Sequence, residues 1–183
     1  MVELLDESAL QTRLLHTSEL SDNQYEEFIE MCCAAYGEDM ASILKKVGAG
    51  WHVLGTLDGA LVSHAMWVVR ELQTGSGHEL NTAYVEAVAT LPEHQGRGFA
   101  TIVMQHLQNE MYEYEFSALS PADTTLYERL GWEHWRGELF IRSGGQLEAT
   151  PDESILVMRL PRTPDNVSLN DSLSAEWRPG EVW

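Results

Sequence analysis

Positive charge is scarce in this sequence of 183 residues. Lys and Arg together number 11 against 29 Asp and Glu, which gives a formal net charge of −18 at pH 7. A surface of this sign repels the phosphate backbone of nucleic acids and concentrates small cations. We therefore expect no nucleic-acid partner. Two interpretations of the acidity stay open: it only maintains solubility, or it attracts a cationic ligand.

Cysteine is also nearly absent. The two cysteines, Cys32 and Cys33, are adjacent in a segment with helical spacing, where neighbouring side chains point away from each other. They can form neither a disulfide framework nor a metal site, so we expect core thiols, with a reactive thiol as the alternative. No group of Cys and His has the spacing of a zinc site, and we predict no metal.

Long apolar runs are missing too, since no run approaches the ~20 residues needed to cross a membrane. The first residues, "MVELLDESALQT", are acidic, whereas a targeting signal would be basic. This favours a soluble, cytoplasmic protein with no membrane partner. A chain of this length with 44% hydrophobic residues can bury one core, which predicts a single domain over 1–183.

Strand-like and helix-like segments alternate along the chain. Apolar residues at spacings of three and four predict a helix over 22–36, with Ser21 as its N-cap and Gly37 at its end. Asp58-Gly59 between two β-rich runs predicts a hairpin. This order predicts an α/β or α+β fold with a mixed sheet. The other expected elements are strands over 12–20, 81–91, 116–120, 137–142 and 153–161 and helices over 40–47, 99–107 and 123–130.

The end of the chain has a different composition. From Arg162 to Ala175 it is rich in Pro, Asn and Ser, which predicts disorder. The last eight residues, "EWRPGEVW", contain two tryptophans, and these favour docking of the tail onto the rest of the protein.

The stretch "QGRGFA", Gln95 to Ala100, leads from a strand into a helix. A P-loop would need Gly-Lys followed by Ser or Thr, and a dinucleotide fingerprint would need a third small residue where Thr101 stands. Small residues at 96, 98 and 100 leave backbone N–H groups accessible at the positive end of the helix, where a diphosphate can bind. In this hypothesis Arg97 adds charge and Gln95 adds a hydrogen-bond donor.

Gln95, Gly98 and Ala100 keep the spacing of the loop that binds the pyrophosphate of acetyl-CoA in the GCN5-related N-acetyltransferases, the GNAT family. The preceding "YVEAVATLPEHQGRG" and the later "LYERLGW" occur in that family's order, so the sequence resembles this family over most of its length. The resemblance implies a GNAT fold, in which a central mixed, mostly antiparallel sheet is flanked by helices. It also implies acetyl-CoA as cofactor and coenzyme A as product. The implied cofactor-binding residues are Val88, Gln95, Gly96, Arg97, Gly98 and Ala100.

Acetyl transfer to an amine requires a neutral nitrogen, stabilisation of an oxyanion and protonation of the leaving thiolate. Glu86 lies among apolar residues of a strand, where a carboxylate is costly unless it faces a cavity. The resemblance implies that Glu86 is the general base, through water, and that Tyr127 is the general acid. It also implies that the Val88 N–H binds the thioester oxygen or the pantetheine arm. The alternatives are an exposed Glu86 on a polar strand face and a Tyr127 that packs in the core, and histidines such as His52 and His64 are interpreted as structural.

A narrower resemblance, to the aminoglycoside 2'-N-acetyltransferases, lies in "TRLLHTSEL", "YVEAVAT", "LYERLGW" and the terminal "EWRPGEVW". It implies that the tail, 162–183, folds back toward the substrate pocket and that the terminal carboxylate of Trp183 binds a ligand amine. Glu38, Asp39 and Glu181 complete the implied substrate-binding set. The alternatives are that Asp39 only caps the next helix and that the tail is loose in solution.

The sequence departs from that subfamily after Asp39, where "MASILKKVG" supplies apolar residues and two lysines instead of a second acid. This makes kasugamycin, which carries a 2'-amine and a carboxylate, a candidate substrate. The function predicted is acetylation of an aminoglycoside 2'-amine, giving antibiotic resistance, by a homodimer. Alternative functions are a protein, peptide or polyamine N-acetyltransferase and a non-catalytic acetyl-CoA-binding module.

Overall fold

The computed structural model describes residues 10–180 and 182–183. The chain divides into two compact units, one formed by Met1–Val68 with Glu86–Asn109 and the other by Val69–Val85 with Glu110–Trp183. Two strands, β3 (Ala60–Thr74) and β4 (Glu79–Thr90), run through both units. Strands pair in antiparallel and parallel fashion and alternate with helices, so the predicted α/β class with a mixed sheet is confirmed.

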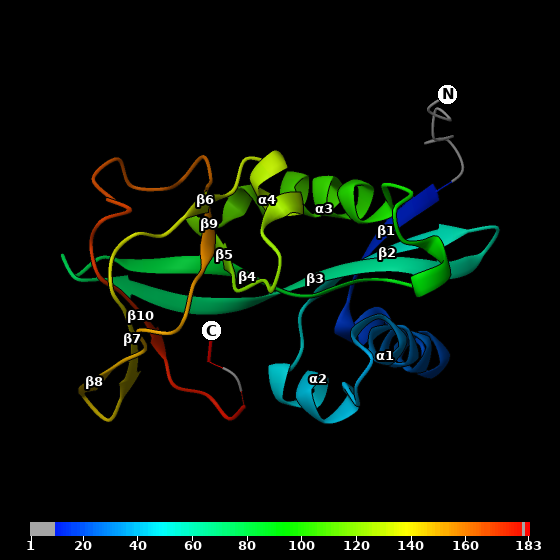
Figure 1. Ribbon diagram of the computed structural model, residues 1–183, viewed down its shortest axis with the longest axis horizontal. Helices are drawn as coiled ribbons and strands as arrows, with labels where there is room; N and C mark the ends of the chain where they lie inside the picture. The colour runs from blue at the N-terminus through cyan, green and yellow to red at the C-terminus, as the bar shows by residue number, and fades with distance from the viewer. Residues whose placement is uncertain (1–9, 181) are drawn as a thin grey trace. The chain divides into compact units, whose positions relative to one another are not determined.

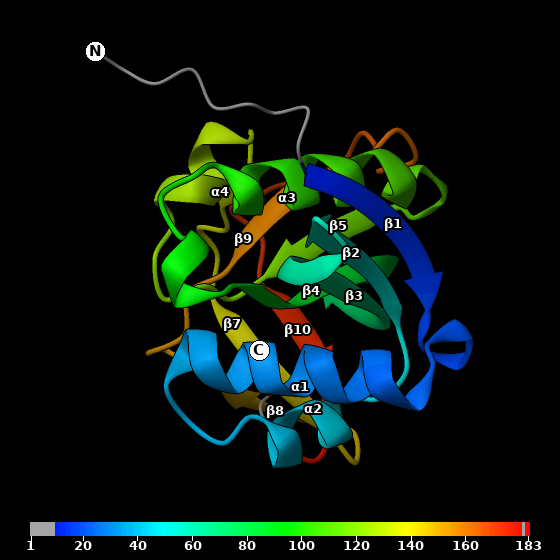
Figure 2. The same ribbon diagram turned by 90° about the vertical axis from the view of Figure 1, so that its right-hand side faces the viewer.

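The first unit contains strands with helices on both faces. β1 (Leu10–His16) pairs antiparallel with β2 (Trp51–Leu57), and β2 pairs antiparallel with the first half of β3. Figures 1 and 2 show α1 and α3 on opposite sides of these strands. The helices are α1 (Asp22–Tyr36), α2 (Ala41–Val47) and α3 (Phe99–Glu110), with single 3-10 turns η1 (Thr17–Glu19) and η2 (Pro92–His94).

Local signals specify most of this unit. Ser21 and Gln24 form a capping box at the start of α1 and Gly37 ends it, as predicted. Asp58 and Gly59 both have positive φ angles, 51° and 84°, and close the predicted hairpin between β2 and β3. β1 is shorter than predicted, because His16 caps a 3-10 turn and donates its N–H to the Glu19 carboxylate at 2.7 Å.

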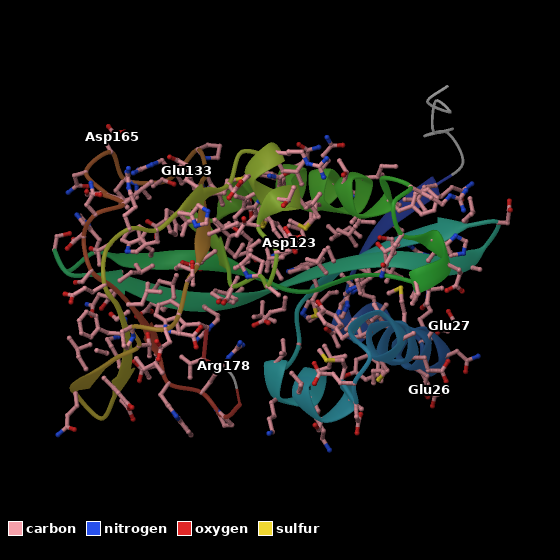
Figure 3. All side chains as sticks on the ribbon, in the orientation of Figure 1. Glu26, Glu27, Asp123, Glu133, Asp165 and Arg178 are labelled. Atoms are coloured by element: carbon pink, nitrogen blue, oxygen red, sulfur yellow. The ribbon has the colours of Figure 1, made fainter. Side chains whose placement is uncertain are left out.

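One helix face is packed and the other solvated in α1. Phe28, Met31 and Cys32 are buried against the unit, whereas Glu26 and Glu27 are exposed. Figure 3 shows Glu26 on the side of α1 that faces away from the strands. Burial, and secondarily Cys33, raise the pKa of the Cys32 thiol to about 12, so this thiol is an inert core group, as predicted.

The second unit is mostly strands. Its helical segments are α4 (Thr125–Arg129) and the 3-10 turn η3 (Met111–Glu113). In sheet order, the first half of β4 is followed by β5, β9 and β6. The second half of β3 is followed by β10, β7 and β8. The strands are β5 (Phe116–Leu119), β6 (Glu133–His134), β7 (Leu139–Ser143), β8 (Gln146–Ala149), β9 (Leu156–Arg159) and β10 (Leu173–Glu176).

The prediction of disorder from Arg162 to Ala175 is wrong at β10. This strand lies between β3, to which it is antiparallel, and β7, to which it is parallel. Leu173 and Ala175 are fully buried, and the hydroxyl of Ser174 donates to Gln73 O at 3.0 Å while accepting from Arg142 at 2.7 Å. The polar composition concealed the strand, because its serine is satisfied inside the sheet.

Among the described residues, no helix is both long and apolar enough to cross a membrane.

A pair of buried histidines lies under α1 in the first unit. The Nδ1 of His52 is 2.9 Å from the Nε2 of His64, and Phe28 packs against both rings. Burial is the main cause of the low pKa of each imidazole, about 4 for His52 and about 3 for His64, and the neighbouring histidine contributes to the latter. Both rings are therefore neutral at neutral pH.

We expect the histidine pair to make folding sensitive to mild acid. Below the unfolded-state pKa of about 6.5 the unfolded chain takes up protons that the folded chain excludes. The free energy of unfolding therefore falls from pH 6.5 toward pH 4, by at most about 1.4 kcal/mol per pH unit for each histidine, and is unaffected by the pair above pH 7. Urea unfolding at pH 7.5, 6.0 and 5.0 measures this slope. His64→Gln is expected to give a shallower slope, and equal slopes for both proteins would contradict the assignment.

Candidate functional site

The loop between β4 and α3 is shaped by two glycines. Gly96 and Gly98 have φ angles of 72° and 81°, in the left-handed region that residues other than glycine rarely adopt. The loop leads into α3 at Phe99, and the first bond of that turn runs from the Ile102 N–H to Gly98 O at 3.2 Å. The N–H groups before Ile102 have no intrahelical acceptor, so they fit the diphosphate of the predicted cofactor.

The two polar side chains of this loop are used inside it. The Gln95 amide donates to Thr90 O at 3.1 Å. The Arg97 guanidinium donates to the Nδ1 of His94 at 3.0 Å and lies 4.8 Å from the centre of the Phe99 ring. Both side chains thereby brace the turn, and the backbone is the part of the loop best placed to bind phosphate oxygens.

The strand before the loop is continuous from Glu79 to Thr90, but its backbone is irregular at the predicted catalytic residues. We call this irregularity, at Glu86–Val88, the break. Ala87, between Glu86 and Val88, has a φ of 48°, which is rare for a residue with a side chain. Glu86, Ala87 and Val88 are all half-buried within a strand that is otherwise mostly buried. Such a break changes the direction of the backbone and re-aims the groups on either side of it.

Two side chains that sequence reasoning did not assign to the site hold this break. The Nδ1 of His64 is 2.8 Å from the Ala87 carbonyl oxygen, and the Tyr36 hydroxyl donates to the Val88 carbonyl oxygen at 2.9 Å. No sequence signal identifies them, because an alanine in the left-handed region cannot be recognised in advance. Only the placement of His64 in the middle of an apolar strand was unusual.

The acidic pair after α1 remains at the surface of the first unit. Glu38 and Asp39 are exposed. One carboxylate oxygen of Asp39 accepts from the Ala41 N–H at 3.1 Å, at the start of α2. Asp39 is not the N-cap residue of α2, which is Met40, but its side chain does accept from the first N–H of that helix. This bond uses one of the two oxygens of the carboxylate.

Tyr127 lies on α4 in the second unit, half-buried and edge-on to the Trp132 ring at 6.3 Å between centroids. Burial, with a smaller contribution from the charge of Asp123, raises the pKa of Tyr127 to about 12. Asp123 itself accepts from the Thr125 N–H at 2.8 Å, and its hydrogen bonds to Thr125 lower its pKa. The phenol is therefore protonated at neutral pH and can donate its proton.

The C-terminal segment is docked in the second unit. Trp183 is 6% exposed, and its indole N–H donates to the Thr150 hydroxyl at 3.0 Å. The guanidinium of Arg70, which is 9% exposed, donates to Val182 O and, at 3.0 Å, to Glu176 O. Arg70 thus binds Glu176 and Val182, which lie at the two ends of this segment. The alternative of a tail loose in solution is wrong for residues 182 and 183.

A tyrosine ring supports the same arginine. The guanidinium of Arg70 lies 4.9 Å from the centre of the Tyr84 ring, and that of Arg178, on the C-terminal segment in Figure 3, lies 5.9 Å from it. Cation–π contacts of this kind favour a fixed guanidinium position. Glu181, also predicted to bind substrate, lies outside the described residues.

The predicted site residues are divided between the two units. The first unit brings together the break at Glu86–Val88 and the loop from Gln95 to Ala100, and it also carries Glu38 and Asp39. The second unit contains Tyr127 and Trp183.

Comparison with known sequences identifies the family. A family model described as an acetyltransferase (GNAT) domain matches residues 16–135. An aminoglycoside 2'-N-acetyltransferase of Mycolicibacterium fortuitum is 32% identical to this chain over 184 residues, which cover 93% of this chain and 91% of that protein. The resemblance found in the sequence motifs is thereby confirmed.

Solved structures agree on the fold. A GNAT family N-acetyltransferase (YhbS) from Escherichia coli in complex with CoA has a TM-score of 0.63 at 16% identity and covers 91% of each chain. A GCN5-related N-acetyltransferase from Kribbella flavida has a TM-score of 0.57 at 18% identity, covering 72% of this chain and 35% of that one. This chain thus spans about a third of the Kribbella protein. The braced glycine loop, the broken strand before it and these matches show that the chain belongs to the GNAT acetyltransferase family, whose members use acetyl-CoA.

Proposed function

We propose that the chain transfers an acetyl group from acetyl-CoA to the 2'-amino group of an aminoglycoside, and so confers resistance to that antibiotic. The observation that carries this proposal is the match to the Mycolicibacterium fortuitum protein, whose name states that activity, over 93% of this chain. The net charge of −18 supports a cationic acceptor.

The proposed setting is the cytoplasm, which fits the free thiols of Cys32 and Cys33. The proposed assembly is a homodimer, the commonest form of soluble oligomer. In each protomer the tail, 162–183, folds back toward the substrate pocket and completes a single acetyltransferase domain.

Acetyl-CoA supplies an activated acetyl group, and the protein binds and orients it. The backbone N–H groups of Gly96, Gly98 and Ala100 hold the diphosphate, with Gln95 and Arg97 bracing the loop from inside. The Val88 N–H donates to the thioester oxygen. This hydrogen bond becomes stronger as negative charge develops on that oxygen during attack by the amine.

Two side chains move the protons. Glu86, acting through a water molecule, removes the proton from the attacking amine as the new C–N bond forms. Tyr127 gives its phenolic proton to the sulfur as the C–S bond breaks, and its raised pKa of about 12 keeps that proton in place until then. The products are the acetylated amine and the free thiol of coenzyme A.

In this proposal, carboxylates bind the ammonium groups of the antibiotic. Glu38 and Asp39 contribute from the end of α1, and Glu181 and the terminal carboxylate of Trp183 contribute from the tail. Arg70 fixes the tail in place through its two carbonyl acceptors, Glu176 O and Val182 O. The lysines at 45 and 46, both exposed on α2, make kasugamycin the proposed preferred substrate, because it carries a carboxylate.

Removing either proton-transfer group is expected to slow turnover without weakening cofactor binding. Glu86→Gln and Tyr127→Phe keep the shapes of the side chains but not their proton chemistry, so kcat should fall roughly 100-fold or more. Thiol release followed with a chromogenic disulfide measures kcat, and calorimetry measures acetyl-CoA affinity. Glu26→Gln and Tyr112→Phe, at exposed positions, are the matched controls. Full activity in both site variants would contradict the mechanism.

The substrate assignment predicts which amines are acetylated. Turnover should occur with compounds that carry a 2'-amine and be lost with their 2'-hydroxy analogues, and kasugamycin should have a higher kcat/KM than kanamycin or gentamicin. Mass spectrometry of the products locates the acetyl group. Efficient acetylation of kanamycin with none of kasugamycin would overturn the preference, and activity on spermidine or a basic peptide alone would overturn the antibiotic assignment.

Releasing the tail is expected to weaken antibiotic binding selectively. Arg70→Met retains the apolar stem but removes both donors, so KM for the antibiotic should rise roughly 10-fold, the size of a lost charge-assisted hydrogen bond. KM for acetyl-CoA should stay within about 2-fold, since its loop lies elsewhere in the sequence. Arg136→Met, at an exposed position, is the control. Unchanged antibiotic KM in folded Arg70→Met would contradict the tail's role.

A further inference from the structure

The geometry points to His64 as a positioning residue for the Val88 N–H, with His52 and Thr17 holding His64 in the required orientation. This inference deepens the proposed function, because it rests on the role of the Val88 N–H in acetyl transfer. The direction of the Val88 N–H is then set by a line of three hydrogen-bonded side chains: Thr17 on η1, His52 on β2 and His64 on β3.

Peptide planarity makes His64 act on Val88. The carbonyl of Ala87 and the N–H of Val88 belong to one peptide unit, in which these two groups are coplanar and point in opposite directions. The Ala87 oxygen is 2.8 Å from the Nδ1 of His64. A hydrogen bond that fixes this oxygen on the His64 side therefore aims the Val88 N–H toward the opposite side.

The hydrogen bonds in the line have one consistent direction. A carbonyl oxygen only accepts, so the Nδ1 of His64 carries the proton, and the Nε2 of this neutral ring accepts. Its partner at 2.9 Å, the Nδ1 of His52, must then donate, which leaves the Nε2 of His52 as an acceptor. The Thr17 hydroxyl has one proton and two acceptors within reach, that Nε2 at 2.9 Å and Gly50 O at 3.0 Å. Because Gly50 O also accepts from the Thr17 N–H, we assign the hydroxyl proton to Nε2.

The Thr17 end of the line is anchored by backbone. The Gly50 N–H donates to the Thr17 hydroxyl oxygen at 2.8 Å, and the Thr17 N–H donates to Gly50 O at 2.8 Å. Every polar group of the line thus has a partner, and both rings take the tautomer with the proton on Nδ1. Reversing any one bond would leave two donors or two acceptors facing each other inside the unit.

Packing prevents the rings from turning. His64 is 0% exposed and His52 is 1% exposed. Phe28 on α1 packs against both, with ring centroids 4.3 Å from His64 and 5.1 Å from His52. The donor aimed at Ala87 is therefore a fixed part of the core.

The peptide on the other side of Val88 is held as well. The Tyr36 hydroxyl, from the end of α1, donates to the Val88 carbonyl oxygen. With His64 on Ala87 O and Tyr36 on Val88 O, both peptide units that flank Val88 are fixed by side chains. Ala87, at a φ of 48°, sits in a conformation that its side chain disfavours, so the held carbonyls are what maintain the break.

Two amide substitutions separate positioning from simple core packing. In His64→Asn the side-chain amide reaches about as far as Nδ1 and can donate to Ala87 O. In His64→Gln the amide reaches about as far as Nε2, so it meets His52 and leaves Ala87 O without its donor. Both variants keep a neutral, polar side chain and lose one of the two bonds of His64.

We expect His64→Asn to keep kcat within about 3-fold and His64→Gln to lower it at least 10-fold, with KM for the amine unchanged in both. The ¹⁵N–¹H signal of the Val88 amide should move in His64→Gln and stay near its wild-type position in His64→Asn. Equal losses of kcat in the two variants, or a Val88 signal that moves equally in both, would show that His64 only fills the core and would overturn the inference.

Failure of the proposed function gives different results from failure of this inference. If the wild-type protein acetylates none of the aminoglycosides, the substrate assignment fails. The Val88 signal and the affinity for acetyl-CoA, measured without any acceptor, still test His64. A Val88 amide that shifts on adding acetyl-CoA in wild type and His64→Asn but not in His64→Gln supports the inference, and the same shift in all three proteins overturns it.

Discussion

The orientation of the peptide between Ala87 and Val88 is the constraint on which the rest of the site depends. The break in β4 is costly for an alanine, and the bonds from His64 and Tyr36 offset that cost from two sides. The cap of α1, the register of the β2–β3 hairpin and the 3-10 turn at Thr17 all serve to place these donors. Much of the first unit can thus be understood as support for one backbone group that precedes the cofactor loop.

The second unit uses its scarce positive charges in a particular way. Four of its arginines donate to backbone carbonyl oxygens. Three of them bind carbonyls after residue 160, namely Arg70 with Glu176 O, Arg142 with Ser174 O and Arg159 with Val167 O. The fourth, Arg162, binds Glu113 O. A guanidinium can satisfy several carbonyls at once because its five N–H groups are fixed in one plane. These arginines keep their positive charge, and Arg142 also lies 3.4 Å from the Glu176 carboxylate. The 29 Asp and Glu still far outnumber the 11 Lys and Arg, so the field of the protein favours cationic ligands.

Sequence alone predicted the parts of the molecule that local chemistry determines. The capping box of α1, the Asp58-Gly59 hairpin and the glycine loop before α3 each depend on a few neighbouring residues. The support for the site could not be predicted in the same way. His64 meets Ala87 across 23 positions of sequence and Tyr36 meets Val88 across 52. No local pattern encodes such contacts, and the strand β10 was missed because its pairing partners, not its composition, make it a strand.

The place of β10 also has a consequence for how the protein is made. It lies between β3 and β7, although it is the last described strand to leave the ribosome. Until residue 176 has emerged, β7 and β8 form only a hairpin with no partner on the β10 side, and a hairpin alone is marginally stable in water. Domains generally fold as units during synthesis, so the sheet of the second unit stays incomplete until β10 has been made. A nonsense codon just before Leu173 would therefore yield a chain that has β7 and β8 but an incomplete, aggregation-prone sheet.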